Sequence, residues 1–102
     1  MWKRACRADE VPRDGLKQVA VDGGPTVVIA GAGDEFFACQ ALCPHQEVPL
    51  AEGVHDGTTL TCLEHLWQFD LRTGEPRGDA EAPMQTYRVK HEDGQVYVWV
   101  EP

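Results

Sequence analysis

Two short segments of the 102-residue chain carry side chains that could bind a metal. Cys43 and His45 stand one residue apart in the first segment. Cys62 and His65 stand two residues apart in the second, and sixteen residues separate His45 from Cys62. Together the segments offer two soft thiolates and two imidazoles, a donor set typical of zinc and iron–sulfur centres.

Two kinds of metal centre fit these four donors. A mononuclear zinc ion would take all four in a tetrahedron. In structural zinc sites, however, Cys usually pairs with Cys and His with His along the chain, whereas here each segment supplies one of each. That interleaving favours a two-iron cluster in which both cysteines bind one iron and both histidines bind the other.

The pattern Cys-x-His, sixteen residues, Cys-x-x-His resembles the motif of Rieske proteins. The resemblance implies one Rieske-type [2Fe–2S] cluster, with Cys43 and Cys62 on the inner iron and His45 and His65 on the outer, exposed iron. It also implies an all-β fold of antiparallel sheets, in which two ligand loops and a proline-bearing third loop form the tip. Residues 78–83 are similar to that third loop. We therefore expect one Rieske domain over residues 1–102, with cluster-binding loops at about 43–52 and 62–68.

The residues around the motif resemble one branch of the family more closely. Residues 43–47 (Cys-Pro-His-Gln-Glu) and 65–69 (His-Leu-Trp-Gln-Phe) are similar to the Rieske ferredoxins of toluene and benzene monooxygenases. This implies a one-electron carrier that is not itself an enzyme. Its partners would be an NADH-dependent flavin/iron-sulfur reductase and the di-iron hydroxylase of an aromatic monooxygenase.

Two related alternatives remain. Ferredoxins of Rieske aromatic-ring dioxygenases resemble Cys-Thr-His-Gly in the first loop, whereas this chain has Pro44 and Gln46. The small subunit of assimilatory nitrite reductase has a related fold in which the ligands can be absent, but all four are present here. High-potential Rieske proteins add a cysteine to each loop and form a disulfide. The matching positions here are Val48 and Glu64, so that disulfide cannot form.

The rest of the chain predicts short strands and no amphipathic helix. Glycine-containing turns separate segments rich in β-branched or alternating apolar residues, as in all-β proteins. An Asp-Gly pair at 93–94 predicts a tight hairpin. Four prolines, at 44, 49, 76 and 83, mark loops because proline cannot sit in a central strand. The expected strands are 16–21, 26–30, 35–42, 58–61, 66–71, 87–90 and 96–100.

Several other reactive side chains have a structural interpretation. Cys6 and Cys39 lie outside the motif, and we expect each to be a small buried hydrophobe. His55 precedes an Asp-Gly turn and His91 ends a predicted strand, so we expect both to be solvated. Trp67 is interpreted as a core aromatic on a strand.

The charge is strongly acidic, with 9 Lys+Arg against 17 Asp+Glu and a net charge of −8. This argues against nucleic acid and anionic membranes as partners. Residues 18–71 contain eight acidic residues and no Lys or Arg, so the excess charge belongs to the segment that holds the predicted ligands. We expect an acidic docking surface at the tip. With no signal peptide or membrane span recognisable, we also expect a cytoplasmic monomer.

Overall fold

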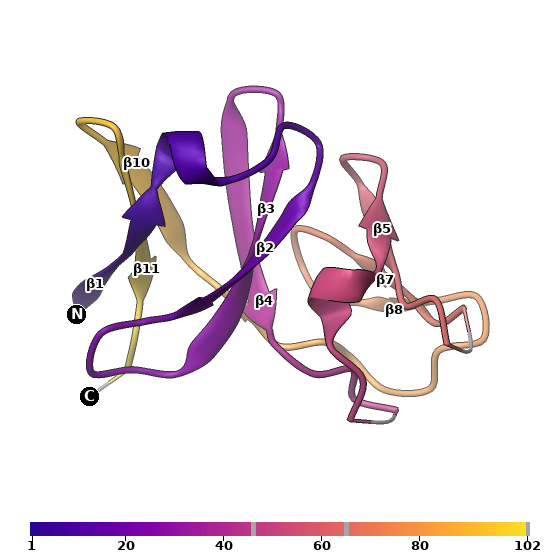
Figure 1. Cartoon of the computed structure of the whole chain (residues 1–102). Helices are drawn as coiled ribbons and strands as arrows, with labels where there is room; N and C mark the ends of the chain where they lie inside the picture. Colours follow the sequence, from indigo (N-terminus) through magenta and orange to yellow (C-terminus); the bar gives the residue numbers. More distant parts are fainter. Residues whose placement is uncertain (46, 65, 102) are drawn as a thin grey trace.

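The computed structural model describes residues 1–45, 47–64 and 66–101, and its regular structure consists mainly of short antiparallel strands (Figure 1). The all-β prediction is confirmed. The described strands form three sheets, ordered β1-β11-β10, β2-β3-β4-β9 and β5-β6-β7-β8. Their bounds are β1 Trp2–Arg7, β2 Leu16–Ala20, β3 Thr26–Ala32, β4 Glu35–Gln40, β5 Val54–His55, β6 Thr59–Thr61, β7 Gln68–Asp70, β8 Pro76–Arg77, β9 Thr86–Tyr87, β10 Val89–Glu92 and β11 Gln95–Trp99. Two single-turn 3₁₀ helices, η1 Ala8–Glu10 and η2 Leu50–Glu52, connect strands.

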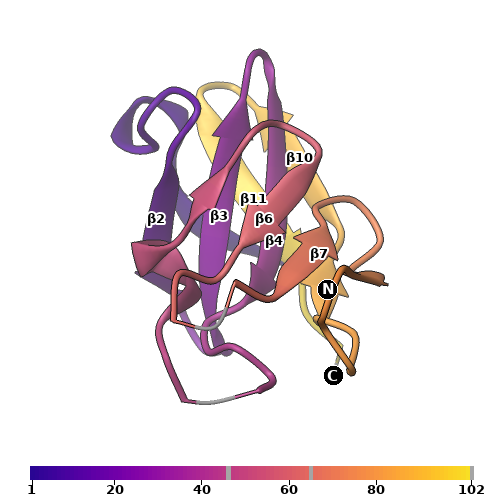
Figure 2. The same ribbon diagram turned by 90° about the vertical axis from the view of Figure 1, so that its right-hand side faces the viewer.

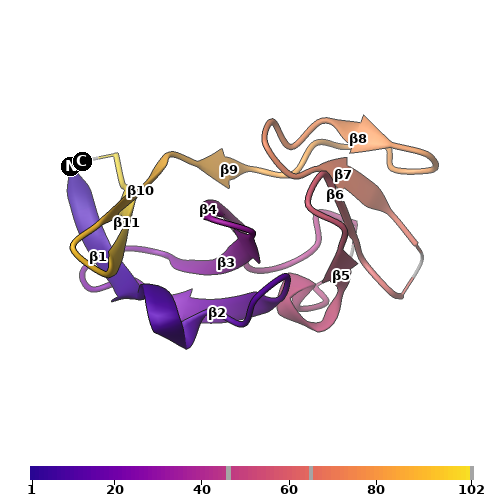
Figure 3. The same cartoon turned by 90° about the horizontal axis from the view of Figure 1, so that it is seen from above.

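The sheet β2-β3-β4-β9 lies between the other two, as Figure 3 shows from above. Strand β3 is buried on both faces: Val27 and Ile29 belong to one hydrophobic core, and Val28 and Ala30 to the other. A strand buried on both sides reads as a continuous apolar run in the sequence instead of an alternating one. This explains the run of β-branched residues at 26–30.

The sheet β1-β11-β10 covers the first of these cores. Val96 and Val98 of β11 pack inward with Ala5 and Cys6 of β1, and all four are buried. Strands β10 and β11 form the hairpin that the Asp-Gly pair predicted. Asp93 and Gly94 both have positive φ, 52° and 76°. Two successive positive φ values match the right-handed twist of the strands that a two-residue turn joins.

The sheet β5-β6-β7-β8 covers the second core. The predicted ligand loops, the first after β4 and the second between β6 and β7, lie at its lower end in Figure 2. Leu60 of β6 stands opposite Phe69 of β7, and both side chains are fully buried. Leu50 of η2 and Leu71 complete the wall that faces β3 and β4. Within the described residues, no helix is long and apolar enough to cross a bilayer.

The structure differs from the sequence predictions at several strands. Strand β1 was not predicted, and the expected strand at 87–90 is divided between β9 and β10. The expected strand at 66–71 begins only at Gln68, because Leu66 and Trp67 lie outside the strand and the carbonyl of Trp67 accepts from Cys62 N–H. Pro76 lies in β8 and not in a loop, which corrects our prediction. Strand β8 is at the edge of its sheet, where the missing N–H of proline can face away from the neighbouring strand.

The third, proline-bearing loop is fixed to the turn that follows β7. Met84 N–H donates to the carbonyl of Gly74 at 2.8 Å, and Ala80 and Ala82 pack against the second core. Gly74 has φ +79°, and a Cβ at this position would lie 1.9 Å from the carbonyl oxygen of Met84. Only glycine permits this close approach between the two backbone segments.

We predict that Gly74→Ala destabilises the fold much more than Gly33→Ala. Both glycines have positive φ, but a Cβ at Gly33 would meet nothing within 4 Å. Each variant pays about 1 kcal/mol for the left-handed backbone. Gly74→Ala should lose about 2 kcal/mol more of its free energy of unfolding, because the added Cβ would push the backbone of Met84 away from residue 74. Urea unfolding measures both values, and equal losses would contradict the close approach.

A second prediction concerns Asp70, which organises the turn between β7 and β8. Its carboxylate accepts hydrogen bonds from the Arg77 guanidinium and from the N–H groups of Thr73 and Arg72. These bonds lower the pKa of Asp70 to about 2, chiefly through Arg77. Because the folded-state pKa lies below the unfolded value of about 3.9, the stabilisation is present above pH 4 and lost as the pH falls towards 2.

Asp70→Asn should therefore reduce the free energy of unfolding at pH 7 by about 1 kcal/mol. The full pKa shift would give more, but the Arg77 side chain is 49% exposed and solvent screens the pair. The difference between the variant and the parent should shrink as the pH falls below 4. A difference that stays constant down to pH 2 would contradict this role of the carboxylate.

Candidate metal centre

The first predicted ligand loop follows β4 and is closed by backbone hydrogen bonds. Leu42 and Pro49 form an isolated antiparallel bridge, and Cys43 N–H donates to the carbonyl of Val48 at 2.9 Å. Leu50 N–H donates to the carbonyl of Ala41 at 2.8 Å. The loop is therefore a small hairpin whose base is held by ladder bonds. Its cysteine lies at the buried end of that hairpin.

The second predicted ligand loop joins β6 to β7 in a similar way. Cys62 N–H donates to the carbonyl of Trp67 at 2.8 Å, which closes the loop directly above the strand pair. Leu66 has φ 58° and is 62% exposed, so the loop holds a leucine in the left-handed region at its outer end. Such a backbone costs about 1–2 kcal/mol, a strain typical of functional loops. The fourth predicted ligand, His65, lies outside the described residues.

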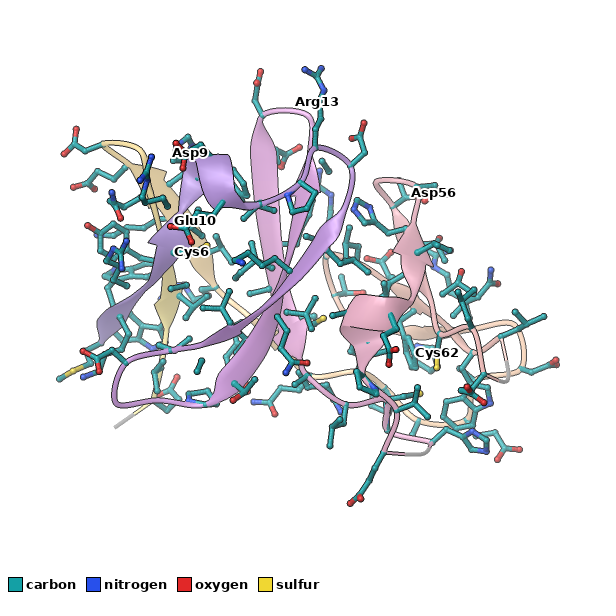
Figure 4. The ribbon with its side chains drawn as sticks, in the orientation of Figure 1. Cys6, Asp9, Glu10, Arg13, Asp56 and Cys62 are labelled. Atoms are coloured by element: carbon teal, nitrogen blue, oxygen red, sulfur yellow. The ribbon has the colours of Figure 1, made fainter. Side chains whose placement is uncertain are left out.

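The two loops meet at an aromatic contact. The ring of His45, from the first loop, stacks on the ring of Trp67, from the second, with centroids 4.4 Å apart and planes 25° apart. Cys43, Cys62 and Trp67 are all buried in the same core, whereas His45 is exposed. The structure thus brings three of the four predicted ligands to one end of the molecule and buries both thiols. Figure 4 shows Cys62 in the part of the molecule that contains the sheet β5-β6-β7-β8, far from Cys6.

The donor set and its environment fit a [2Fe–2S] cluster with mixed ligands. Buried thiols at the base of two adjacent loops can hold one iron away from solvent. An exposed imidazole further out in a loop can hold the other iron near the surface. The aromatic ring of Trp67 limits how far the His45 ring can turn, so one histidine is already oriented by its neighbour.

The two other cysteines have the structural surroundings that the sequence suggested. Cys6 lies in the core beneath β1, and burial raises the pKa of its thiol. Cys39 faces the same core as Cys43 and Cys62, and burial raises the pKa of its thiol to about 12. A thiol with so high a pKa carries almost no thiolate at neutral pH and is a poor metal ligand. Trp67 is 8% exposed, as expected for a core aromatic, but it lies just before β7 and not on a strand, which corrects that part of the prediction.

His55 is the residue whose importance the sequence did not reveal. We expected a solvated side chain, but the ring is partly buried and both nitrogens are hydrogen-bonded. Gly57 N–H donates to Nδ1 at 3.0 Å, and Nε2 lies 3.1 Å from the carbonyl oxygen of Gly15. The tautomer with its hydrogen on Nε2 satisfies both contacts, because Nδ1 then accepts and Nε2 donates. His55 thereby joins β5 to the loop that precedes β2.

Comparisons with known proteins agree with this geometry. The sequence model of a family described as the Rieske [2Fe-2S] domain matches residues 1–89. The methanesulfonate monooxygenase ferredoxin subunit of Methylosulfonomonas methylovora is 39% identical over 100 residues, which cover 97% of this chain and 80% of that protein. The biphenyl dioxygenase ferredoxin subunit of Pseudomonas sp. (strain KKS102) is 36% identical over 99 residues, with coverage of 95% and 90%.

A solved complex contains a chain of the same fold. It is a complex of reduced oxygenase and oxidised ferredoxin in carbazole 1,9a-dioxygenase. The matched chain has a TM-score of 0.84 and 28% identity, and the match covers 95% of this chain and 91% of that chain.

We predict that Trp67→Leu weakens retention of the metal centre. The substitution removes the ring that stacks on His45 and leaves unfilled space beside Phe69, 6.2 Å from Trp67 between ring centroids. It should lower the free energy of unfolding by about 2 kcal/mol. It should also make the visible absorbance of the holoprotein decay several-fold faster in the presence of a chelator.

Trp99→Leu is the matched control, because Trp99 packs edge-on against Trp2 in another sheet. This variant should lose stability without a faster decay of the absorbance. Equal decay rates in the two variants would show that the stacked ring does not hold the ligand loop.

Proposed function

Because the chain belongs to the Rieske [2Fe–2S] family, we propose that it delivers single electrons to the oxygenase component of an oxygenase system. Relatives across nearly its whole length are named as ferredoxin components of monooxygenases and dioxygenases, which are electron carriers and not catalysts. The family's cofactor is one Rieske-type [2Fe–2S] cluster, which accepts one electron and releases it again. The observation that carries the proposal is the pair of ligand loops with buried thiols and an exposed imidazole at one end of the fold.

We assign the four motif side chains as cluster ligands. Cys43 and Cys62 hold the inner iron, and both sulfur atoms come from a core that excludes water. His45 and His65 hold the outer iron. The exposure of His45 supports this arrangement, because an electron leaving through an exposed imidazole edge has only a short distance to travel to a docked protein.

The finer assignment is that the acceptor is the di-iron hydroxylase of a toluene/benzene-type monooxygenase and the donor is an NADH-dependent flavin/iron-sulfur reductase. The sequence around the ligands supports it, notably Pro44 in the first loop and Trp67 in the second. The relative at 39% identity is also the ferredoxin of a monooxygenase. A ring-hydroxylating dioxygenase is the second candidate acceptor, favoured by the relative from the biphenyl dioxygenase system.

The test is a single-turnover electron transfer. The purified holoprotein should be coloured and, after reduction with dithionite, should give an EPR signal from one reduced cluster. Mixed anaerobically with the oxygenase component encoded beside its gene, it should be reoxidised with one electron transferred per chain. The identity of that oxygenase, di-iron hydroxylase or Rieske dioxygenase, decides between the two acceptors.

Cys43→Ser is the matched variant, because it changes one sulfur atom to oxygen at a buried position and leaves the loop hydrogen bonds possible. It should fold without the absorbance or the EPR signal. A colourless parent protein that contains zinc would overturn the proposal, and so would a coloured protein whose reduced form transfers no electrons to the oxygenase.

A further inference from the structure

A groove lies between the two predicted ligand loops. Its volume is about 220 Å³, below the roughly 300–1,000 Å³ of sites that enclose a whole small molecule. One wall is the end of the first loop and η2, and the other is the residue pair that follows Cys62. The groove is lined by Val48, Pro49, Glu52, Gly53, Leu63 and Glu64.

The lining combines apolar walls with two carboxylates. Leu63 is 55% exposed, although burying a leucine would be favourable, so it offers apolar surface to a partner. Glu52 and Glu64 are exposed. Among the described residues, neither carboxylate forms an ion pair with a Lys or Arg side chain.

The structure also narrows the acidic surface that the sequence suggested. Two acidic residues of the segment 18–71 are already paired with cations from outside it: Glu35 with Arg72, and Asp70 with Arg77. Asp56 lies at the opposite end of its sheet from Cys62, as Figure 4 shows, and accepts hydrogen bonds from its own turn. The carboxylates left at the ligand loops are Glu47, Glu52 and Glu64, and two of these three line the groove.

We propose that this groove receives one arginine or lysine side chain of the oxygenase component. The aliphatic stem of that side chain lies against Leu63 and Val48, and its charged head lies between Glu52 and Glu64. Long basic side chains bury their methylene groups against apolar surface while the charge stays with its counter-ions. The groove is built from the same loops as the ligands, so one inserted side chain fixes the exposed imidazole edge against the acceptor.

The proposal rests on the proposed function, since it names the partner of an electron carrier. The experiment therefore measures binding and electron transfer separately. Calorimetry with the oxidised holoprotein and the oxygenase component encoded beside its gene gives Kd. Glu52→Gln and Glu64→Gln should each weaken binding about tenfold, which corresponds to about 1.4 kcal/mol. Unchanged absorbance and EPR spectra show that the cluster site is intact in each variant.

Glu47→Gln is the matched control, because Glu47 is an exposed carboxylate of the first loop that does not line the groove. It should weaken binding less than threefold. If one cation bridges Glu52 and Glu64, the double variant should weaken binding by about 10–30-fold, less than the hundredfold product of the single effects. In a double variant of Glu47→Gln and Glu52→Gln, the two fold-changes in Kd should instead multiply, because these carboxylates share no cation.

Three results would overturn the proposal that this groove receives a basic side chain. One is an effect of Glu47→Gln as large as that of the groove variants, which would indicate a diffuse acidic field. Another is multiplicative behaviour of Glu52→Gln and Glu64→Gln, and the third is an oxygenase that does not bind the parent protein. Binding with the expected pattern but without electron transfer would support the groove and refute the proposed function.

Discussion

The burial of β3 on both faces is the constraint on which the rest of the structure depends. Val28 and Ala30 face the core beneath the ligand loops, while Val27 and Ile29 face the core beneath β1 and β11. A strand in this position has no solvent face, so each neighbouring sheet is needed to cover one side of it. The small sheet that carries the ligand loops is therefore held in place by burial and does not depend on its own few ladder bonds.

This arrangement explains how two short loops can hold their cysteines in a fixed position. Each loop is closed by a backbone hydrogen bond from its cysteine, to Val48 in one loop and to Trp67 in the other. Each cysteine side chain then enters the core that β3 supports, so the backbone and the side chain are fixed together. The imidazole of His45 is held differently, by stacking on Trp67 at the surface. The two thiols of the predicted metal site are thus fixed in the core, and the ring of His45 lies at the surface, open to a partner.

The sequence predicted the chemistry better than it predicted the strands. Type and spacing left a zinc ion and a two-iron cluster open, the resemblance to the Rieske motif predicted the cluster, and membership of the family confirms it. The assignment of the four ligands stays a prediction. Strand β1 was missed because its residues do not alternate: the two buried ones, Ala5 and Cys6, are adjacent, where the register with β11 shifts. The two-residue strands β5, β8 and β9 are defined only by their partners, which a local pattern cannot reveal. His55 was missed for the same reason, because its partner Gly15 is forty residues away.

The fold shows where in the molecule the excess negative charge lies. Two cations outside the acidic segment lie against the aromatic rings of the sheet β1-β11-β10: Arg88 against Trp2 and Trp99, and Lys90 against Trp2 and Tyr97. The part of the chain outside residues 18–71 has nine acidic and nine basic residues, and is neutral overall. In space, the charge divides differently: residues 41–83, which carry the ligand loops and the sheet β5-β6-β7-β8, have eight acidic and two basic residues, and the rest of the chain has nine acidic and seven basic. The negative charge is therefore concentrated at the ligand-loop end, and the molecule has a dipole. Because a dipole aligns in the field of a basic partner before contact, the loops approach first. The long-range electrostatic field then sets the orientation of the encounter, and the proposed groove between the loops binds the partner's basic side chain only on contact.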